Sequence, residues 1–183
     1  MKRALVFAIL ALGIGAGAAR APGAQIGIGP YAGYNAALIQ QDTGNGAVFG
    51  VRAPIALAPM ITIEPYYASS SLGDVDEEFG GLSYTRSGFD MKTFGATAII
   101  GSILTEGFKF YPFAGIGSYQ MERTGSEDIK ETGFNFGFGF SVPAGAKIHV
   151  QARGGMDMIV TEDTSRKFAN GTIGITYTLM SGE

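Results

Sequence analysis

Apolar side chains alternate with polar or small ones along most of the chain, which is the period-two pattern of a β-strand. The clearest case is residues 133–142, GFNFGFGFSV, where phenylalanine stands at every second position from Phe134 to Phe140. The residues between them are asparagine, glycine, glycine and serine. A strand of a soluble β-sandwich would present a face of charged and hydroxyl side chains to water. This pattern instead indicates a strand whose large residues face lipid and whose bare face lines a narrow interior.

Eight segments of roughly ten residues show this alternation, and about nine to eleven residues are what a tilted strand needs to cross a bilayer. In seven of the eight, an apolar face opposes a clearly polar or glycine-rich face. The fourth segment is less regular, because a register with Phe94 outward also places Asp90 and Lys92 outward near the upper rim unless a bulge shifts them. Its register therefore stays open. The segments lie at 26–36, 47–57, 61–68, 89–100, 108–119, 133–142, 148–158 and 170–179.

Short and long connections alternate between these segments. The connections after the second, fourth and sixth are APM, GSILTEG and PAG, whereas those after the first, third, fifth and seventh are longer and polar. The long ones are IQQDTGNG, SSLGDVDEEFGGLSYTRSG, ERTGSEDIKETG and TEDTSRK, and they hold 11 of the 16 acidic residues. This layout is typical of an up-and-down barrel with short periplasmic turns and longer outer loops.

The predicted fold is therefore all-β, an eight-stranded antiparallel up-and-down transmembrane β-barrel. No charge falls on a clearly assigned outward face, where Lys or Arg at mid-bilayer would cost about 2–4 kcal/mol. An open strand edge leaves backbone groups unpaired in hydrocarbon, at several kcal/mol each. We therefore expect the first strand to pair with the last.

The first 24 residues follow the pattern of a secretory signal peptide, with Lys2 and Arg3 ahead of the apolar run ALVFAILALGIGAGAA. Cleavage after Ala24 is preferred, and cleavage after Ala19 also fits. The barrel domain is then 25–183. A membrane-anchoring helix is disfavoured because the run is short and interrupted by glycine. Cleavage after Ala24 removes three basic residues and leaves ten basic against 16 acidic residues. The resulting net charge of about −6 points away from binding to nucleic acid.

Three stretches resemble a known family, namely GPYAGYN (29–35), YPFAGIGSYQ (111–120) and GITYTL (174–179). They are similar to the eight-stranded outer-membrane β-barrels grouped with the OmpA transmembrane domain, the opacity-type surface proteins and porin-like barrels. The resemblance implies a location in the outer membrane of a Gram-negative-type bacterium. It also implies that the barrel-assembly machinery reads the last strand, where Thr172, Gly174, Tyr177 and Leu179 fill the polar, glycine, aromatic and apolar places. The chain departs from many relatives by continuing to Glu183.

Charged residues also fall on predicted inward faces. If Ala58 is the centre of the short turn after the second strand, Arg52 lies directly opposite Glu64, and Ile55 opposite Ile61. Arg153 is also inward and is expected to approach Glu64 across the lumen. Two further charges complete the predicted lumen cluster, Lys109 and Asp157. The resemblance implies that such a cluster plugs the barrel and acts as a gate, whereas the simpler interpretation is that it satisfies polar groups and fixes strand register.

A structural or surface-interaction role follows, with a monomer contacting outer-membrane lipid, lipopolysaccharide and a surface ligand through its loops. The alternative is a narrow channel for ions or small hydrophobic molecules. A lipid-A-modifying enzyme is the third class, and it is not expected because the single histidine, His149, points inward and is followed by Val150 and Gln151.

No cofactor or metal is expected. The absence of cysteine removes thiolate sites. The acidic stretch GDVDEEFGG (73–81) has Phe79 and Thr85 where an EF-hand needs glycine and glutamate. It is interpreted as a solvated loop, with loose Mg²⁺ or Ca²⁺ bridging to lipopolysaccharide as the open alternative.

Overall fold

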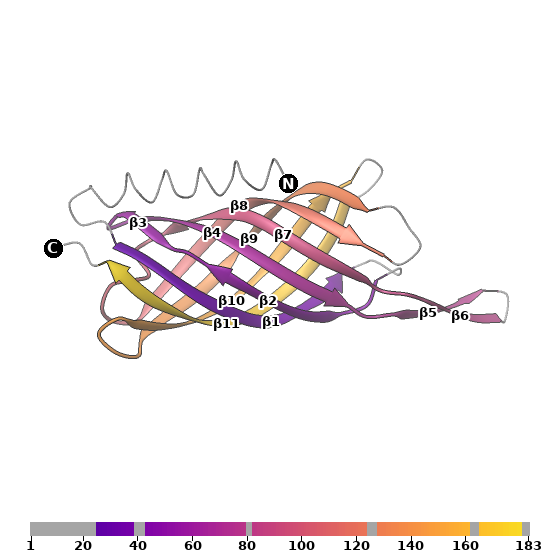
Figure 1. The fold of residues 1–183 in the computed structure, drawn as a ribbon, viewed down its shortest axis with the longest axis horizontal. Coiled ribbons are helices and arrows are strands. Elements are labelled where there is room, and N and C mark those ends of the chain that lie inside the picture. The colour runs from indigo at the N-terminus through magenta and orange to yellow at the C-terminus, as the bar shows by residue number, and fades with distance from the viewer. Residues whose placement is uncertain (1–24, 39–42, 80–81, 124–127, 162–164, 181–183) are drawn as a thin grey trace.

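The computed structural model of the chain is a cylinder of antiparallel strands (Figure 1). It describes residues 25–38, 43–79, 82–123, 128–161 and 165–180. The predicted signal peptide, 1–24, lies outside these residues. Within them, no helix is long and apolar enough to cross a membrane. The strands are β1 (Gln25–Leu38), β2 (Gly46–Arg52), β3 (Ile55–Ala58), β4 (Ile61–Leu72), β5 (Val75–Phe79), β6 (Leu82–Arg86), β7 (Phe89–Ile100), β8 (Lys109–Glu122), β9 (Ile129–Pro143), β10 (Ile148–Val160) and β11 (Ser165–Met180).

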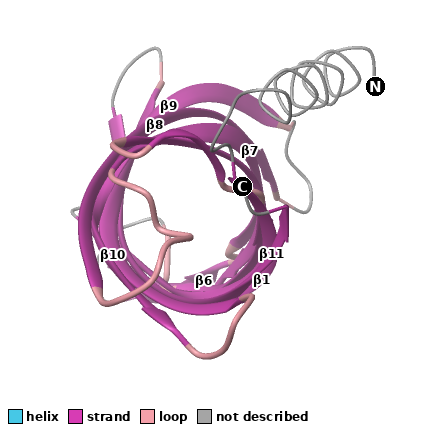
Figure 2. Ribbon diagram, turned by 90° about the vertical axis from the view of Figure 1, so that its left-hand side faces the viewer, coloured by secondary structure: helices cyan, strands magenta, loops and turns pink. Residues whose placement is uncertain are grey.

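The barrel is closed and has eight wall positions, as predicted. Around the ring each wall strand pairs with the next wall strand along the chain, so that β4 pairs with β7, and β3 continues β2 between β1 and β4. The first strand pairs with the last from Ile26 opposite Met180 to Leu38 opposite Lys167. Figure 2 shows the resulting ring end-on. Around this ring β4 is diametrically opposite β10, and β7 is opposite β11.

The predicted faces are confirmed in β9 and β11, where the alternation is clearest. In β9 the four phenylalanines from Phe134 to Phe140 are exposed on the outer surface, whereas Asn135 and Ser141 are buried. The same alternation holds in β11, where Ile173, Ile175, Tyr177 and Leu179 are exposed and Thr172, Thr176 and Thr178 are buried. An exposed apolar belt of this kind is the surface that a membrane-spanning barrel presents to acyl chains.

The open register of the fourth segment is also resolved. β7 pairs residue by residue with both β4 and β8, without a bulge in either ladder. Asp90 and Lys92 are therefore exposed on the outer surface near the long-loop end. Lys92 Nζ forms an ion pair with a Glu122 carboxylate oxygen at 2.7 Å. The two charges neutralise each other at the edge of the apolar belt.

Several strands extend further than the sequence predicts. Residues assigned to long loops at 70–72, 122, 129–133 and 165–167 belong to β4, β8, β9 and β11. The second long loop contains a separate hairpin, β5 paired with β6, which projects beyond the ring (Figure 1). Most of these residues are polar because the wall continues past the lipid, so the alternation that marks a spanning strand is weaker there.

The second predicted strand is interrupted. The wall breaks between Arg52 and Ile55, and Ala53 donates its backbone N–H to the Pro65 carbonyl at 2.9 Å. A register shift between Ala56 and Ala58 follows. Ile55 pairs with Ile63 rather than with Ile61, and it is buried beside Ile26 instead of exposed. Pro54 cannot donate to the ladder, which explains why a continuous strand was the wrong expectation here.

Inward glycines provide the space that inward aromatic rings occupy. Tyr111 on β8 is directly opposite Gly139 on β9, and a Cβ at Gly139 would come within 2.5 Å of Tyr111 Cζ. Tyr31 on β1 covers Gly50 on β2 in the same way. The inner face of β9 therefore carries glycine because aromatic rings lie against its backbone.

Candidate functional site

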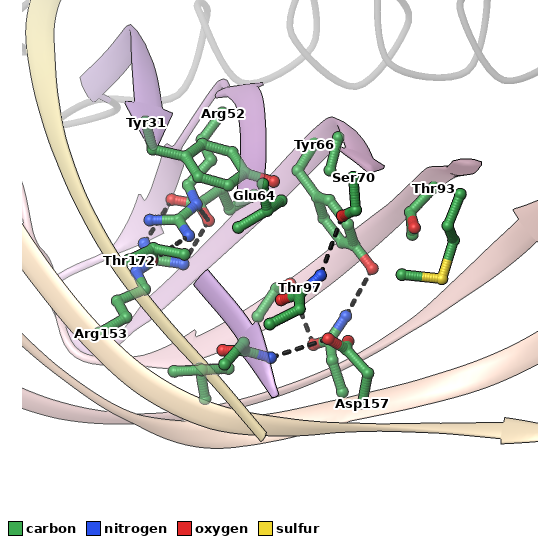
Figure 3. Close-up of a pocket in the computed structure, with 17 residues that line it drawn as sticks. Tyr31, Arg52, Glu64, Tyr66, Ser70, Thr93, Thr97, Arg153, Asp157 and Thr172 are labelled. Atoms are coloured by element: carbon green, nitrogen blue, oxygen red, sulfur yellow. Dashed lines mark hydrogen bonds and ion pairs between the residues drawn. The ribbon is translucent and has the colours of Figure 1, made fainter. Parts of the chain in front are cut away.

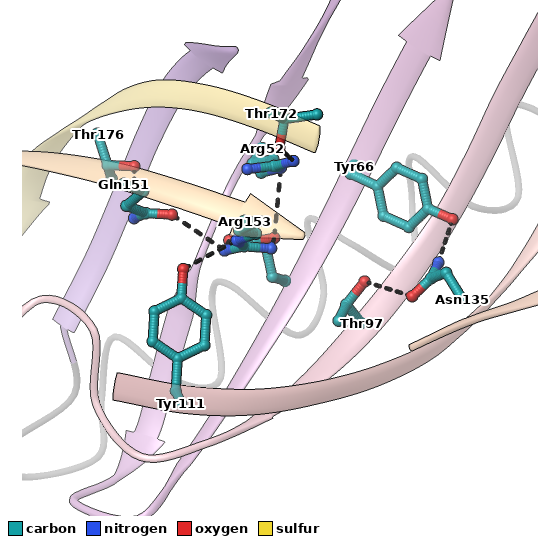
Figure 4. A network of polar contacts seen from close by, with 10 residues as sticks. Arg52, Tyr66, Thr97, Tyr111, Asn135, Gln151, Arg153, Thr172 and Thr176 are labelled. Carbon is teal, nitrogen blue, oxygen red and sulfur yellow. Dashed lines mark hydrogen bonds and ion pairs between the residues drawn. The ribbon is translucent and has the colours of Figure 1, made fainter. Parts of the chain in front are cut away.

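The centre of the lumen holds an ion pair between opposite walls. Glu64 on β4 is completely buried, and its two carboxylate oxygens accept hydrogen bonds from Arg153 Nη1 and Nη2 at 2.5 and 2.6 Å. Arg153 lies on β10, diametrically across the ring. Its Nε donates to the Tyr111 hydroxyl at 2.9 Å, and Nη2 also donates to Gln151 Oε1 at 3.0 Å (Figure 4). Bidentate pairs of this kind are the strong, directional form of a charge-assisted hydrogen bond.

Arg52 is a second cation beside the same carboxylate. Its Nε lies 3.9 Å from Glu64 Oε1, its guanidinium carbon is 3.7 Å from the centre of the Tyr31 ring, and Nη2 donates to Thr172 at 2.8 Å. Stacking on Tyr31 and bonding to Thr172 hold Arg52 against the β1 and β11 side of the wall. One carboxylate therefore faces two guanidinium groups, and Arg153 makes the closer contact.

The predicted cross-strand register of Arg52 is wrong. In the β2–β4 ladder Arg52 is opposite Tyr66, not Glu64. The turn is centred on Pro59 instead of Ala58, because Ile55 pairs with Ile63. Glu64 is reached diagonally, which is consistent with the long 3.9 Å separation.

A second polar layer lies between this pair and the long-loop end. Asp157 accepts hydrogen bonds from the Tyr119 hydroxyl and from Asn170, each at 2.7 Å. Asn135 donates to the Tyr66 hydroxyl at 2.6 Å. The hydrogen-bond partners of Asp157 in the described chain are thus neutral groups, and neither of them belongs to the Glu64–Arg153 pair.

The two layers border a cavity of about 70 Å³, shown in Figure 3. A water molecule needs about 10–15 Å³ of such volume, so the cavity has room for roughly five. Arg52, Glu64, Arg153 and Asp157 all line it. Arg52 Nη1 is buried and makes no hydrogen bond within the described chain. A water molecule in the cavity is the natural partner for this donor.

Lys109 is not part of this cluster. It is the first residue of β8, half-buried at the short-turn end and opposite Ser141. None of the ion pairs of the described chain joins it to Glu64. Parity placed it inward correctly, but its height along the strand separates it from the central pair.

An apolar cluster fills the lumen at the long-loop end. Phe89 on β7 and Phe168 on β11 meet edge to face, with ring centres 6.5 Å apart, although their strands stand on opposite sides of the ring. Side chains from opposite walls therefore meet inside the lumen at this height. The outer cluster consists of Leu72, Phe89, Met91, Tyr119, Met121, Ile159 and Phe168.

The connection between β7 and β8 folds into the short-turn end of the lumen. Ile103 and Leu104 in this connection are buried and pack with Ile99 and Tyr111. The prediction of GSILTEG as an ordinary short turn missed this role. The signal available in the sequence was the pair of large apolar residues inside an otherwise polar turn.

Ser141 and His149 are both buried on the inner face of the barrel near the short-turn end. Ser141 donates its hydroxyl hydrogen to the Ile103 carbonyl at 3.0 Å, whereas His149 hydrogen-bonds the backbone of Thr105. The serine and the histidine thus bind the closing turn rather than each other. Among the described residues, no group of three or more metal-ligating side chains is close enough to hold an ion.

The residues of the predicted assembly signal lie at the end of β11. Gly174 faces inward beside Tyr31, and Tyr177 and Leu179 are exposed on the outer surface. β11 ends at Met180. Recognition by an assembly machinery is a matter for experiment and stays a prediction.

Comparison with known proteins supports the fold. No family model matches the sequence, and no curated protein matches it. Neisserial surface protein A has a similar structure, with a TM-score of 0.62 and 13% identity over 85% of this chain and 96% of that one. A major outer membrane protein from Thermus thermophilus has a TM-score of 0.58 and 11% identity, covering 85% and 99%. The Yersinia pestis outer membrane protein Ail in a phospholipid bilayer nanodisc has a TM-score of 0.50 and 15% identity, also covering 85% and 99%.

The closed ring, the outward apolar belt and these likenesses define one class of fold, the eight-stranded outer-membrane β-barrel. This confirms the resemblance drawn from the three sequence stretches at the level of the fold. A barrel of this class with a lipid-facing belt is located in the bacterial outer membrane.

Proposed function

We propose that the protein is a closed, non-enzymatic barrel with a structural and surface-interaction role in the outer membrane. The single observation that carries this proposal is the filling of the lumen at three heights. The outer apolar cluster, the Glu64–Arg153 pair and the closing turn each join walls or segments from different sides of the ring. A barrel filled in this way serves as a membrane-embedded support, so its interactions are expected at the surface.

The surface partners we propose are outer-membrane lipid, lipopolysaccharide and a ligand bound through the long connections. The exposed aromatic and aliphatic belt supports contact with acyl chains. The β5–β6 hairpin supports a role for the second long connection, because it carries Asp76 and Glu78, with Asp74 directly before it, away from the membrane on a defined backbone. We further propose that residues 1–24 are removed by cleavage after Ala24, and that the barrel is inserted as a monomer by the barrel-assembly machinery through β11.

A narrow channel is the second candidate, and the polar cavity beside two competing arginines is the observation that favours it. In that case the ion pair of Glu64 and Arg153 would act as the gate implied by the family resemblance. The outer apolar cluster weighs against this candidate, because ions would have to cross it.

Conductance of the mature protein in planar bilayers separates the two candidates. The structural role predicts no steady conductance above the lipid background, in the parent and in Glu64→Gln alike. Discrete openings in the parent, or openings that appear with Glu64→Gln, would favour the channel. Binding to lipopolysaccharide-containing vesicles, measured with each long connection deleted in turn, then identifies the connection that carries the surface role. If none of the four deletions reduced binding, the loop-mediated contact would be contradicted.

A further inference from the structure

The connection between β7 and β8, residues 101–107, folds back into the barrel instead of turning at its rim. Ile103 is completely buried, and Leu104 is only 4% exposed. Figure 2 looks at this end of the barrel and shows a loop that bends inward from the wall of the ring. A turn that only joined two neighbouring strands would leave such residues at the lipid or water surface.

The contacts of this segment reach almost the whole ring. Leu104 lies close to Gly27 on β1, since a Cβ there would be 3.1 Å from Leu104 Cδ2. The Ile103 carbonyl accepts from Ser141 on β9 at 3.0 Å, and the Gly101 carbonyl accepts from Thr62 on β4 at 2.8 Å. His149 on β10 hydrogen-bonds the backbone of Thr105. A segment that leaves from β7 and contacts β1, β4, β9 and β10 extends across the mouth of the barrel.

Glycines stand at both ends of the segment. Gly101 has φ +115° and Gly107 has φ +82°, and a Cβ at either would meet no atom within 4 Å. Positive φ is open to glycine at little cost and disfavoured for other residues. The segment between them is therefore joined to the wall through two backbone positions that can change conformation without a side chain in the way.

The covering segment is also joined to the central ion pair. Tyr111 packs against Ile103 and Leu104, while its hydroxyl accepts a hydrogen bond from Arg153 Nε at 2.9 Å. Arg153 in turn binds Glu64. One side chain thus contacts both the segment at the mouth and the pair at the centre.

We propose that residues 101–107 form a hinged stopper of the short-turn end, and that Tyr111 couples its seating to the Glu64–Arg153 pair. When the stopper leaves its seat, the polar interior opens to the periplasm on one side only, because the outer apolar cluster remains in place. The proposal goes beyond the proposed structural role, and it does not depend on the identity of any surface partner.

Because the sequence contains no cysteine, a single introduced cysteine is the only thiol that a reagent can modify. Thr176 faces the lumen on β11 and is 3% exposed. It lies beside Leu104, since both would contact a Cβ at Gly27. In the folded Thr176→Cys protein in lipid vesicles, we expect slow modification by a water-soluble methanethiosulfonate reagent.

Unseating the stopper should expose this reporter. Adding Leu104→Ser is expected to raise the modification rate at least tenfold, and Tyr111→Phe should raise it by a smaller factor by removing only the bond to Arg153. Gly107→Ala tests the hinge without changing a packed side chain, and it should also raise the rate. Ala144→Ser, in the exposed turn between β9 and β10, is the matched control and should have no effect. Heat-modifiability on gels confirms that each variant is folded.

Two results would overturn the proposal. Fast modification in the parent reporter would mean that the segment does not cover the mouth. An unchanged rate in both Leu104→Ser and Gly107→Ala would mean that the lumen is sealed by something else. If only Tyr111→Phe had no effect, the stopper would stand and the coupling to the ion pair would be wrong. The conductance and vesicle-binding results of the proposed function are independent of all three outcomes.

Discussion

Replacing Glu64 by glutamine tests the energetics of the lumen most directly. The change removes a buried carboxylate that binds Arg153 through two hydrogen bonds and lies 3.9 Å from Arg52. Two buried guanidinium groups then lose their counter-charge. Removal of one partner of a buried pair typically costs about 3–5 kcal/mol. With a denaturant slope of about 2 kcal/mol per molar urea, the midpoint of unfolding should fall by about 2 M.

The two arginines should not be equivalent. Arg153→Gln loses both bonds to Glu64 and those to Tyr111 and Gln151, so its cost should match that of Glu64→Gln. Arg52→Gln loses one hydrogen bond to Thr172 and the stacking on Tyr31. It also relieves the repulsion between two nearby cations. We expect a cost of about 1–2 kcal/mol, from about 1.5–3 for a charged hydrogen bond and about 0.5–2 for the cation–π contact, less that relief.

Urea unfolding of the barrel from lipid vesicles, followed by tyrosine fluorescence, provides the free energies for two double-mutant cycles. The interaction energy between Glu64 and Arg153 should be at least about 2 kcal/mol, and that between Glu64 and Arg52 should be below about 1 kcal/mol. Additive effects for Glu64 and Arg153, within about 0.5 kcal/mol, would refute the assignment of the central pair. A larger coupling to Arg52 than to Arg153 would show that the carboxylate changes partners in the membrane.

Three further predictions concern location, orientation and packing. The mature protein should fractionate with outer membranes and run differently in boiled and unboiled SDS gels, and recovery from the soluble periplasm would end the barrel assignment. Epitope tags inserted at Asn45 and Asp128 should be accessible on intact cells, and tags at Ala58 and Ala144 should not; the opposite pattern would invert the orientation. Gly139→Val should lower the free energy of unfolding by about 1–3 kcal/mol, because its side chain would displace the Tyr111 ring. Gly145→Val, in an exposed turn with open space around it, should cost little, and equal losses would argue against ring packing on glycine.

Much of the wall could be predicted because lipid imposes a strict rule on one face. Residues that face lipid have to be apolar, as Phe134 to Phe140 on β9 and the outward residues of β11 are. The residues between them could therefore be assigned to the lumen from the alternation alone. Parity also placed Glu64 and Arg153 in the lumen and suggested their contact across it. The geometry that parity cannot supply is height along the barrel, which is why Lys109 was grouped with a pair that it does not reach.

The wrong predictions fall where a local feature interrupts the two-residue alternation of a strand. Pro54 and the irregularity near Ala56 move the turn centre from Ala58 to Pro59, and this shift separates Arg52 from the position opposite Glu64. The stopper escaped detection because burial of Ile103 depends on contacts with strands far away in the sequence. The β5–β6 hairpin was interpreted as a loop because its acidic strand lacks the apolar face that marks strands elsewhere.

The outer apolar cluster has a consequence for protein engineering. It lies at a height where the outward residues of β4, β7 and β8 are Ser71, Asp90 and Glu122, so polar side chains lie outside it on these three strands. This part of the barrel therefore has the cross-section of a small water-soluble domain, with its own interior, mounted on a lipid-anchored base. Foreign segments grafted between β8 and β9 would start and end on a rigid frame, and doubling their length would add only about 0.6 kcal/mol of closure cost. Such a rim could carry folded antigens at a cell surface while the strands below remain unaltered.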